Sequence, residues 1–255
     1  MDRQNILARL HLHAVLPVLA KICEFDREAQ DVTKDWNATI QFGYLGGPSA
    51  QLQFTGGKCR AYRQAAVKPD VNFWFPTATL LNNLFLGQGV TLPLINGFWN
   101  VKLIKGFIAL TKRLEYYLKE LDGQPLEGEI RQKVLTAKLS VATWATAILC
   151  EHDSAQAAFA NHIPAGGTLN MIIAPEGPDF YFKKTGAGTF LAGDGKVADP
   201  TAELSFASPA IAMDLVNGAI DTMAALGKRD LVIRGLIPMV DDVSAVMENV
   251  ESYLA

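Results

Sequence analysis

The spacing of hydrophobic positions changes along the N-terminal half, and each spacing predicts a different element. From residue 5 to residue 29, apolar side chains recur every three or four positions, which is typical of an amphipathic helix. Over 37–66 and 71–75, apolar and polar residues alternate, which predicts strands. Thr77 is a suitable N-cap and Gly87 a suitable C-terminal residue for the short helix that follows. The pattern then predicts a strand over 99–105 and an amphipathic helix over 107–120.

The C-terminal half repeats this order of elements. We predict a helix over 129–151, strands near 168–174, 179–184, 188–192 and 201–206, and a short helix that Ser208 caps. A strand over 229–234 and an amphipathic helix from Val240 to Leu254 complete it. Strands and helices are grouped rather than strictly alternating, which favours an α+β fold over a doubly wound one. Each half should be an antiparallel-rich sheet covered by helices.

Three segments of the first half are similar to three segments of the second. They are spaced 127, 131 and 129 residues apart: Ile22–Asp26 with Leu149–Asp153, Pro69–Thr77 with Pro200–Ser208, and Val101–Gly106 with Asp230–Gly235. A period near half the chain indicates two homologous domains rather than a solenoid. We expect domains over residues 1–122 and 129–255, with the Gly- and Pro-containing stretch from Leu121 to Gly128 as the linker.

Amino-acid composition and net charge limit the classes of function that the chain can have. Hydrophobic residues make up 49% of the chain and charged residues 19%, so we expect a large core, an internal cavity or a sizeable interface. A net charge of −3 provides no basic field for a phosphate backbone, which argues against nucleic-acid binding. The longest apolar stretches look too short or too interrupted to span a bilayer. Three scattered cysteines indicate no disulfide framework and favour a cytoplasmic location.

The repeated pieces resemble the lipid-binding domain of the sterol carrier protein type 2 family. That family has an alternating strand, a short capped helix that ends in Gly, a basic-aliphatic strand that ends in Gly, and an amphipathic helix. The second copy fits best, with Phe206–Pro209, Val216–Gly218 and Leu231–Gly235. The resemblance implies a tandem of sheets covered on one side by helices, with a hydrophobic tunnel for acyl chains or sterols.

Apolar side chains around the short helices are the candidate ligand-binding residues. They are Leu84, Phe85, Leu92 and Leu94 in the first copy, and Phe206, Met223, Leu226, Ile237 and Met239 in the second. Methionine adapts to irregular apolar surfaces, which suits a flexible ligand. The alternative is that these residues form an ordinary core. Lys105 and Arg234, at the ends of two strands predicted to be equivalent, could hold a lipid headgroup or could be exposed strand ends.

We find no catalytic signature in the chain. Cys59 lies between Lys58 and Arg60, but neighbouring side chains of a strand point to opposite faces, so we expect a core or cavity-lining thiol. No His or Cys spacing is typical of a metal site. We therefore expect no enzyme activity, no metal and no cofactor.

The function expected from these observations is intracellular lipid binding or transfer. The partner would be a fatty acid, an acyl ester, a sterol or an isoprenoid lipid, with transient membrane contact and room for a protein partner. The alternative is a non-catalytic accessory or scaffold protein without a ligand, in which the apolar excess forms a pseudo-dimeric interface between the copies.

Overall fold

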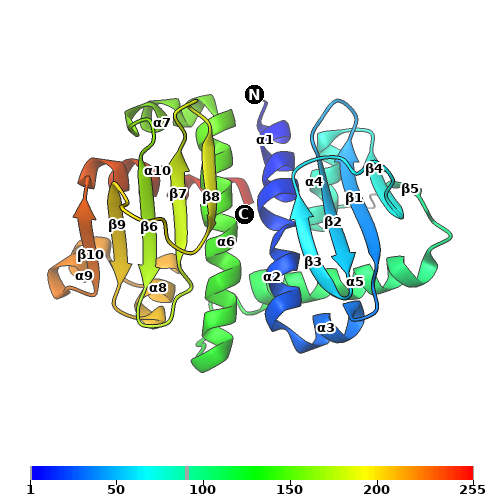
Figure 1. Ribbon diagram of the computed structural model, residues 1–255, viewed down its shortest axis with the longest axis horizontal. Helices are drawn as coiled ribbons and strands as arrows, with labels where there is room; N and C mark the ends of the chain where they lie inside the picture. The colour runs from blue at the N-terminus through cyan, green and yellow to red at the C-terminus, as the bar shows by residue number, and fades with distance from the viewer. Residues whose placement is uncertain (1, 90–91, 255) are drawn as a thin grey trace. The chain divides into compact units, whose positions relative to one another are not determined.

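Two five-stranded mixed sheets, each with its own helices, make up this computed structural model, which describes residues 2–89 and 92–254 (Figure 1). The chain divides into unit 1, Met1–Glu120, and unit 2, Leu121–Ala255. Strands β4 and β9 alternate between buried and partly exposed positions along their length. Each sheet therefore buries one face, and the predicted α+β class is confirmed.

Unit 1 begins with helices and continues into its sheet. Its elements are α1 (Arg3–Leu10), the π-helical segment η1 (His11–Val15), α2 (Val18–Phe25), α3 (Arg27–Thr33), β1 (Ala38–Tyr44), β2 (Ser49–Thr55), β3 (Lys58–Tyr62), β4 (Val71–Phe75), α4 (Ala78–Leu86), β5 (Leu94–Asn96), α5 (Val101–Glu115) and the π-helical segment η2 (Tyr116–Glu120). The strand order is β3-β2-β1-β4-β5. Strands β1 and β4 are parallel, and the other neighbours are antiparallel.

Unit 2 has the same plan, except that a further helix, α9 (Thr222–Lys228), lies between its short helix and its edge strand. Its elements are α6 (Gly128–His152), the 3₁₀ segment η3 (Ser154–Gln156), α7 (Ala157–His162), β6 (Thr168–Ile173), β7 (Phe180–Lys184), β8 (Phe190–Asp194), β9 (Ala202–Phe206), α8 (Pro209–Val216), α9 (Thr222–Lys228), β10 (Leu231–Gly235) and α10 (Ile237–Leu254). The order is β10-β9-β6-β7-β8, and β6 and β9 are the parallel pair. Read from the other edge, this is the strand order of unit 1.

The strand and short helix of the clearest sequence repeat occupy the same place in both units. Strand β4 leads into α4, where the Thr77 hydroxyl accepts from the Leu80 N–H at 3.3 Å. Strand β9 leads into α8, where the Ser208 hydroxyl accepts from the Ile211 N–H at 3.3 Å. A capping hydroxyl satisfies one of the N–H groups that the first turn of a helix leaves unpaired. Helix α4 ends at Gly87, which is left-handed with φ 68°.

The strand predicted over 99–105 is wrong, because Val101–Glu115 is one continuous helix, α5. The edge strand of unit 1 is instead β5, whose ladder joins Phe73 to Ile95. Residues 101–105 take the helical period because they continue the apolar stripe of Phe107, Leu110 and Leu114, which are buried. The sequence pairing of Gly106 with Gly235 therefore does not hold in the structure.

The structural counterpart of Gly235 is Gly97. Gly97 directly follows β5 and Gly235 is the last residue of β10, and both have positive φ, at 87° and 80°. A Cβ on Gly97 would lie 2.0 Å from the carbonyl oxygen of Asp70, and one on Gly235 would lie 2.3 Å from that of Thr201. Asp70 and Thr201 directly precede β4 and β9. Only glycine combines this backbone conformation with such a close approach.

The end of the final helix is anchored in the same way in both units. Asp26, which follows α2, accepts a hydrogen bond from the Tyr117 hydroxyl at 2.8 Å. Asp153, which follows α6, accepts one from the Tyr253 hydroxyl at 2.9 Å. The apolar residues before each tyrosine have the same spacing: Phe107, Leu110 and Leu114 in α5, and Val243, Val246 and Val250 in α10. The two final helices therefore correspond position by position over this stretch.

Two helical stretches are long and apolar enough to cross a membrane by length and composition, Arg3–Phe25 and Gly128–His152. This corrects the expectation that no apolar stretch reaches such a length. In each, 72% of the most apolar window is buried inside the protein. Burial also covers polar side chains within them, such as His11 and Ser140. Their apolar composition is therefore explained by burial within a folded protein.

Candidate functional site

Exposed apolar side chains gather at corresponding connections of the two units. They lie between the short helix and the edge strand, and between the edge strand and the last helix: Leu92, Leu94, Phe98, Trp99 and Val101 in unit 1, and Val216, Met223, Leu236 and Ile237 in unit 2. Trp99 is 66% exposed and Met223 is 73% exposed. We call these residues the apolar rim, since a contiguous exposed apolar surface commonly marks a binding surface.

The nine candidate ligand-binding residues are distributed between this rim and the core. Leu84, Leu92, Leu94, Met223 and Ile237 are exposed, Phe85 and Leu226 are half-buried, and Phe206 and Met239 are buried. The structure brings Phe206 and Met239 into one core, because α10 packs against β9. Among the unit 1 candidates, Phe85 contacts the buried His11 ring of its own unit.

Phe85 stacks on the ring of His11 with their centroids 4.7 Å apart. His11 Nδ1 lies 3.0 Å from the Asn82 side-chain oxygen, and the Asn82 amide nitrogen donates to the main-chain and side-chain oxygens of Gln4. The oxygen of Asn82 can only accept, so His11 donates from Nδ1. Burial lowers the pKa of His11 to about 4, although the Asn82 hydrogen bond opposes the shift. His11 is therefore a neutral, stacked core residue at neutral pH.

Three aromatic rings occupy the core of unit 1 between its sheet and α5. Phe42 of β1 stacks on Phe73 of β4 with centroids 4.8 Å apart. Phe107 of α5 packs on both rings, at 5.4 Å and 6.0 Å. All three side chains are buried. Rigid rings in mutual contact leave little freedom for this part of the core to rearrange around a ligand.

The same three positions of unit 2 carry smaller side chains, one of which is a flexible methionine. The parallel ladder pairs Phe42 with Phe73 in unit 1 and Met171 with Leu204 in unit 2. Phe107 corresponds to Val243, since each precedes the anchoring tyrosine by the same spacing. Met171, Leu204 and Val243 are all buried.

Sequence reasoning missed Met171 and Leu204 as site residues. None of the three repeated segments includes β1 or β6, so only the ladder reveals that Met171 takes the place of Phe42. With Met213 and Met239 also buried in unit 2, its core is rich in methionine, which can adapt its shape.

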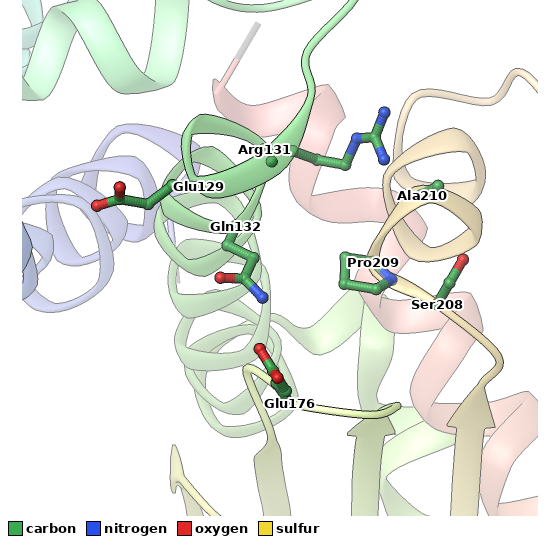
Figure 2. Close-up of a pocket in the computed structure, with 8 residues that line it drawn as sticks. Glu129, Arg131, Gln132, Glu176, Ser208, Pro209 and Ala210 are labelled. Atoms are coloured by element: carbon green, nitrogen blue, oxygen red, sulfur yellow. The ribbon is translucent and has the colours of Figure 1, made fainter.

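Two surface hollows are lined by polar and apolar groups together. One, of about 380 Å³, lies in unit 2 where the first turn of α6 faces that of α8, with Arg131, Gln132 and Glu176 around it (Figure 2). Arg131 donates to the Leu126 carbonyl at 2.6 Å and Ser208 caps α8, so both groups already have structural partners. The other, of about 660 Å³, lies in unit 1 beside Trp99 and Asp70. None of the nine candidate residues lines either hollow.

The cysteines have structural surroundings, and the described residues form no metal site. Cys59 is buried in β3 between exposed Lys58 and Arg60, and its contact with the Cys23 thiol, together with burial, raises its pKa. All three cysteines are free and buried. Within residues 2–89 and 92–254, no group of three or more His, Cys, Asp or Glu side chains could hold a metal ion.

Lys105 and Arg234 do not occupy equivalent strand ends, because Lys105 lies on α5. This corrects the expectation that the two residues form a matched pair. Arg234 does lie on an edge strand, β10, and forms an ion pair with Glu203 at 3.3 Å.

Comparison with known proteins gives weak similarities. No protein-family description and no curated protein sequence matches the chain. Among solved structures, sterol carrier protein 2 from Yarrowia lipolytica is similar, with 12% identity and a TM-score of 0.32, over 49% of this chain and 95% of that one. The inverting sec-alkylsulfatase Pisa1 from Pseudomonas sp. matches with 11% identity and a TM-score of 0.25, over 57% of this chain and 28% of that one. Both scores are too low to carry an argument about function.

Proposed function

We propose that this protein binds a lipid in unit 2, as a non-catalytic carrier of an acyl, sterol-like or isoprenoid-like ligand in the cytoplasm. One observation carries the proposal: the positions filled by three packed phenylalanines in unit 1 are filled by Met171, Leu204 and Val243 in unit 2. Unit 2 also exposes the apolar side chains of Met223 and Ile237. The resemblance of the second copy to sterol carrier domains supports the same assignment.

Burial of an apolar chain provides the binding energy. Each methylene removed from water contributes about 0.8 kcal/mol. A ligand would enter past the rim residues Met223 and Ile237, and would settle against Met171 and Met239 as their flexible side chains change rotamer. Binding of this kind makes and breaks no covalent bond. Its selectivity would come from the length and shape of the apolar part of the ligand.

Native mass spectrometry of freshly purified protein, followed by solvent extraction and lipid identification, tests the proposal. We expect a co-purifying fatty acid, acyl ester, sterol or isoprenoid in near-stoichiometric amount. A ligand-free mass, from protein that also fails to take up a fluorescent fatty acid, would overturn the proposal and favour the accessory-protein alternative. Hydrolysis of an acyl ester that is lost in Cys59→Ala would contradict the non-catalytic reading.

A further inference from the structure

The connection from β5 to α5 exposes the largest apolar side chains of unit 1. The β5–α5 apex is formed by Leu92, Leu94, Phe98, Trp99 and Val101, followed along α5 by Lys102 and Lys105. Phe98 and Trp99 are each 66% exposed, and their rings meet edge to face at 5.3 Å. The connection follows β5, which is an edge strand of the unit 1 sheet (Figure 1). Exposure of two large aromatic residues to water is unfavourable unless another phase or molecule covers them.

The sequence segment that contains the apex, residues 71–114, has basic residues but no acidic ones. No acidic residue lies between Asp70 and Glu115, whereas Lys102, Lys105, Lys112 and Arg113 do. Arg113 is used internally, in an ion pair with Asp26 at 2.6 Å. Lys102, Lys105 and Lys112 are exposed, and in the described chain no carboxylate lies within ion-pair distance of them.

Unit 2 has the opposite charge at the same place. When α5 and α10 are matched through their buried stripes, Lys105 corresponds to Asp241, and the next position of α10 is Asp242. Asp241 is exposed, and Asp242 lies 3.5 Å from His162. Both units therefore expose apolar side chains at this connection, but the matched start of the last helix carries a lysine in unit 1 and carboxylates in unit 2.

We infer that the β5–α5 apex docks the protein onto an anionic lipid bilayer. Trp and Phe favour the membrane interface, where a large ring enters the boundary of the hydrocarbon. Lysines near an anionic surface each contribute about 1 kcal/mol to the attraction. The inference goes beyond the proposed ligand site, which lies in unit 2. It assigns the two units different tasks, with unit 1 meeting the membrane and unit 2 holding the lipid.

Nearby carboxylates limit the strength of this attraction. The hollow beside Trp99 and Lys102 is also lined by Asp31, Asp35 and Asp70. The Asp70 carboxylate accepts a hydrogen bond from the Thr39 N–H at 2.8 Å, which does not neutralise its charge. We therefore expect the affinity of an aromatic wedge with a few lysines, weakened by salt, rather than that of a polybasic cluster.

Vesicle flotation of the full-length protein tests the inference, with phosphatidylcholine vesicles that either contain or lack phosphatidylserine. We expect binding to the serine-containing vesicles, and binding that is roughly thirtyfold weaker for Lys102→Ala with Lys105→Ala, from the loss of two lysines. Phe98→Ala with Trp99→Ala should abolish binding. The control in unit 2, Leu191→Ala, removes an apolar side chain that is 48% exposed and lies outside the proposed ligand site, and it should bind vesicles like the original protein.

Three results would overturn the membrane assignment. They are equal binding to both kinds of vesicle, binding that survives the Phe98 and Trp99 substitutions, and a change of oligomeric state in that variant without any vesicle binding by the original protein. The last would show that a second copy covers the apex. Fatty-acid uptake measured without vesicles separates the two proposals, because apex variants should retain it. If neither the original protein nor any variant takes up fatty acid, while vesicle binding is as predicted, only the proposed ligand site would be overturned.

Discussion

His11 shows how burial changes the chemistry of one side chain. Its ring lies between Phe85 and Asn82 and is 3% exposed. A charged imidazolium is poorly solvated there, so the neutral form is favoured and the pKa falls from 6.5 to about 4. His11 is therefore a structural group whose protonation opposes folding.

Stability should fall as pH is lowered through this window. Between pH 6.5 and about 4, the unfolded chain binds a proton at His11 that the folded protein excludes. The free energy of unfolding should therefore decrease by up to about 1.4 kcal/mol per pH unit from this residue. Urea unfolding at pH 7 and pH 5 measures the effect, and His11→Gln should reduce the difference between the two midpoints. The same difference in both proteins would contradict the assignment.

Asp26 and Asp153 occupy equivalent places in the two units, but, among the residues that the structure describes, only Asp26 has a charged partner. Asp26 accepts from the Ala29 N–H and the Tyr117 hydroxyl and pairs with Arg113. Burial alone would raise the pKa of Asp26, but the Arg113 guanidinium and the two hydrogen bonds outweigh it and lower the pKa. Asp153 accepts from the Ala155 N–H and the Tyr253 hydroxyl, which are neutral donors.

The same substitution should therefore have different costs in the two units. Asp26→Asn leaves the guanidinium of Arg113 without its buried partner, and we expect a loss of about 3 kcal/mol in the free energy of unfolding. Asp153→Asn weakens neutral hydrogen bonds only, with an expected loss of about 1 kcal/mol. Chemical denaturation of both variants gives the comparison. Equal losses would show that the ion pair adds nothing to the anchor.

At the scale of elements, the edge strands depend on two glycines. Gly97→Ala and Gly235→Ala would each force a Cβ against a carbonyl oxygen from a backbone with positive φ. We expect each to lose more than about 2 kcal/mol of stability. Gly46→Ala is the control, because Gly46 has φ 76° but no atom within 4 Å of the added Cβ, and its cost should be about 1 kcal/mol. Equal thermal shifts for all three variants would show that the close carbonyl contact at Gly97 and Gly235 adds no cost.

The sequence predicted the elements whose periodicity is long or whose caps are clear. Thr77 and Ser208 marked the two short helices, and the alternation over 71–75 and 201–206 marked the strands before them. The edge strand β5 was missed because three residues between Pro93 and Gly97 offer only one alternation. The following residues, Val101 to Lys105, fit a strand as well as a helix when read alone.

The candidate site was less predictable than the fold, because it depends on pairing between strands. Composition identified an apolar excess, and the region around the short helices was singled out for it. Which apolar residues are rim and which are core depends on burial, as Met223 and Met239 show, with 73% and 1% exposure. The exchange of Phe42 for Met171 becomes visible only when the two parallel ladders are matched.

At the scale of the whole molecule, two units of one plan have different cores and different charges. Unit 1 has an aromatic core and lysines at the start of its last helix, and unit 2 has a methionine-containing core and acidic residues at the corresponding helix start. A tandem can divide two tasks in this way, because each unit keeps its own sheet and helices. We therefore expect a single ligand per chain.

Exchange of the core residues between units tests the central claim most directly. Native mass spectrometry should count one lipid per chain in the original protein and in Phe42→Met with Phe73→Leu. It should count none in Met171→Phe with Leu204→Phe, because added rings fill the ligand space of unit 2. Thermal melts of Leu204→Phe and of the double variant check that the lipid is not lost because the protein has unfolded. Two lipids per chain in the original protein, or one lipid retained in folded Met171→Phe with Leu204→Phe, would contradict the account.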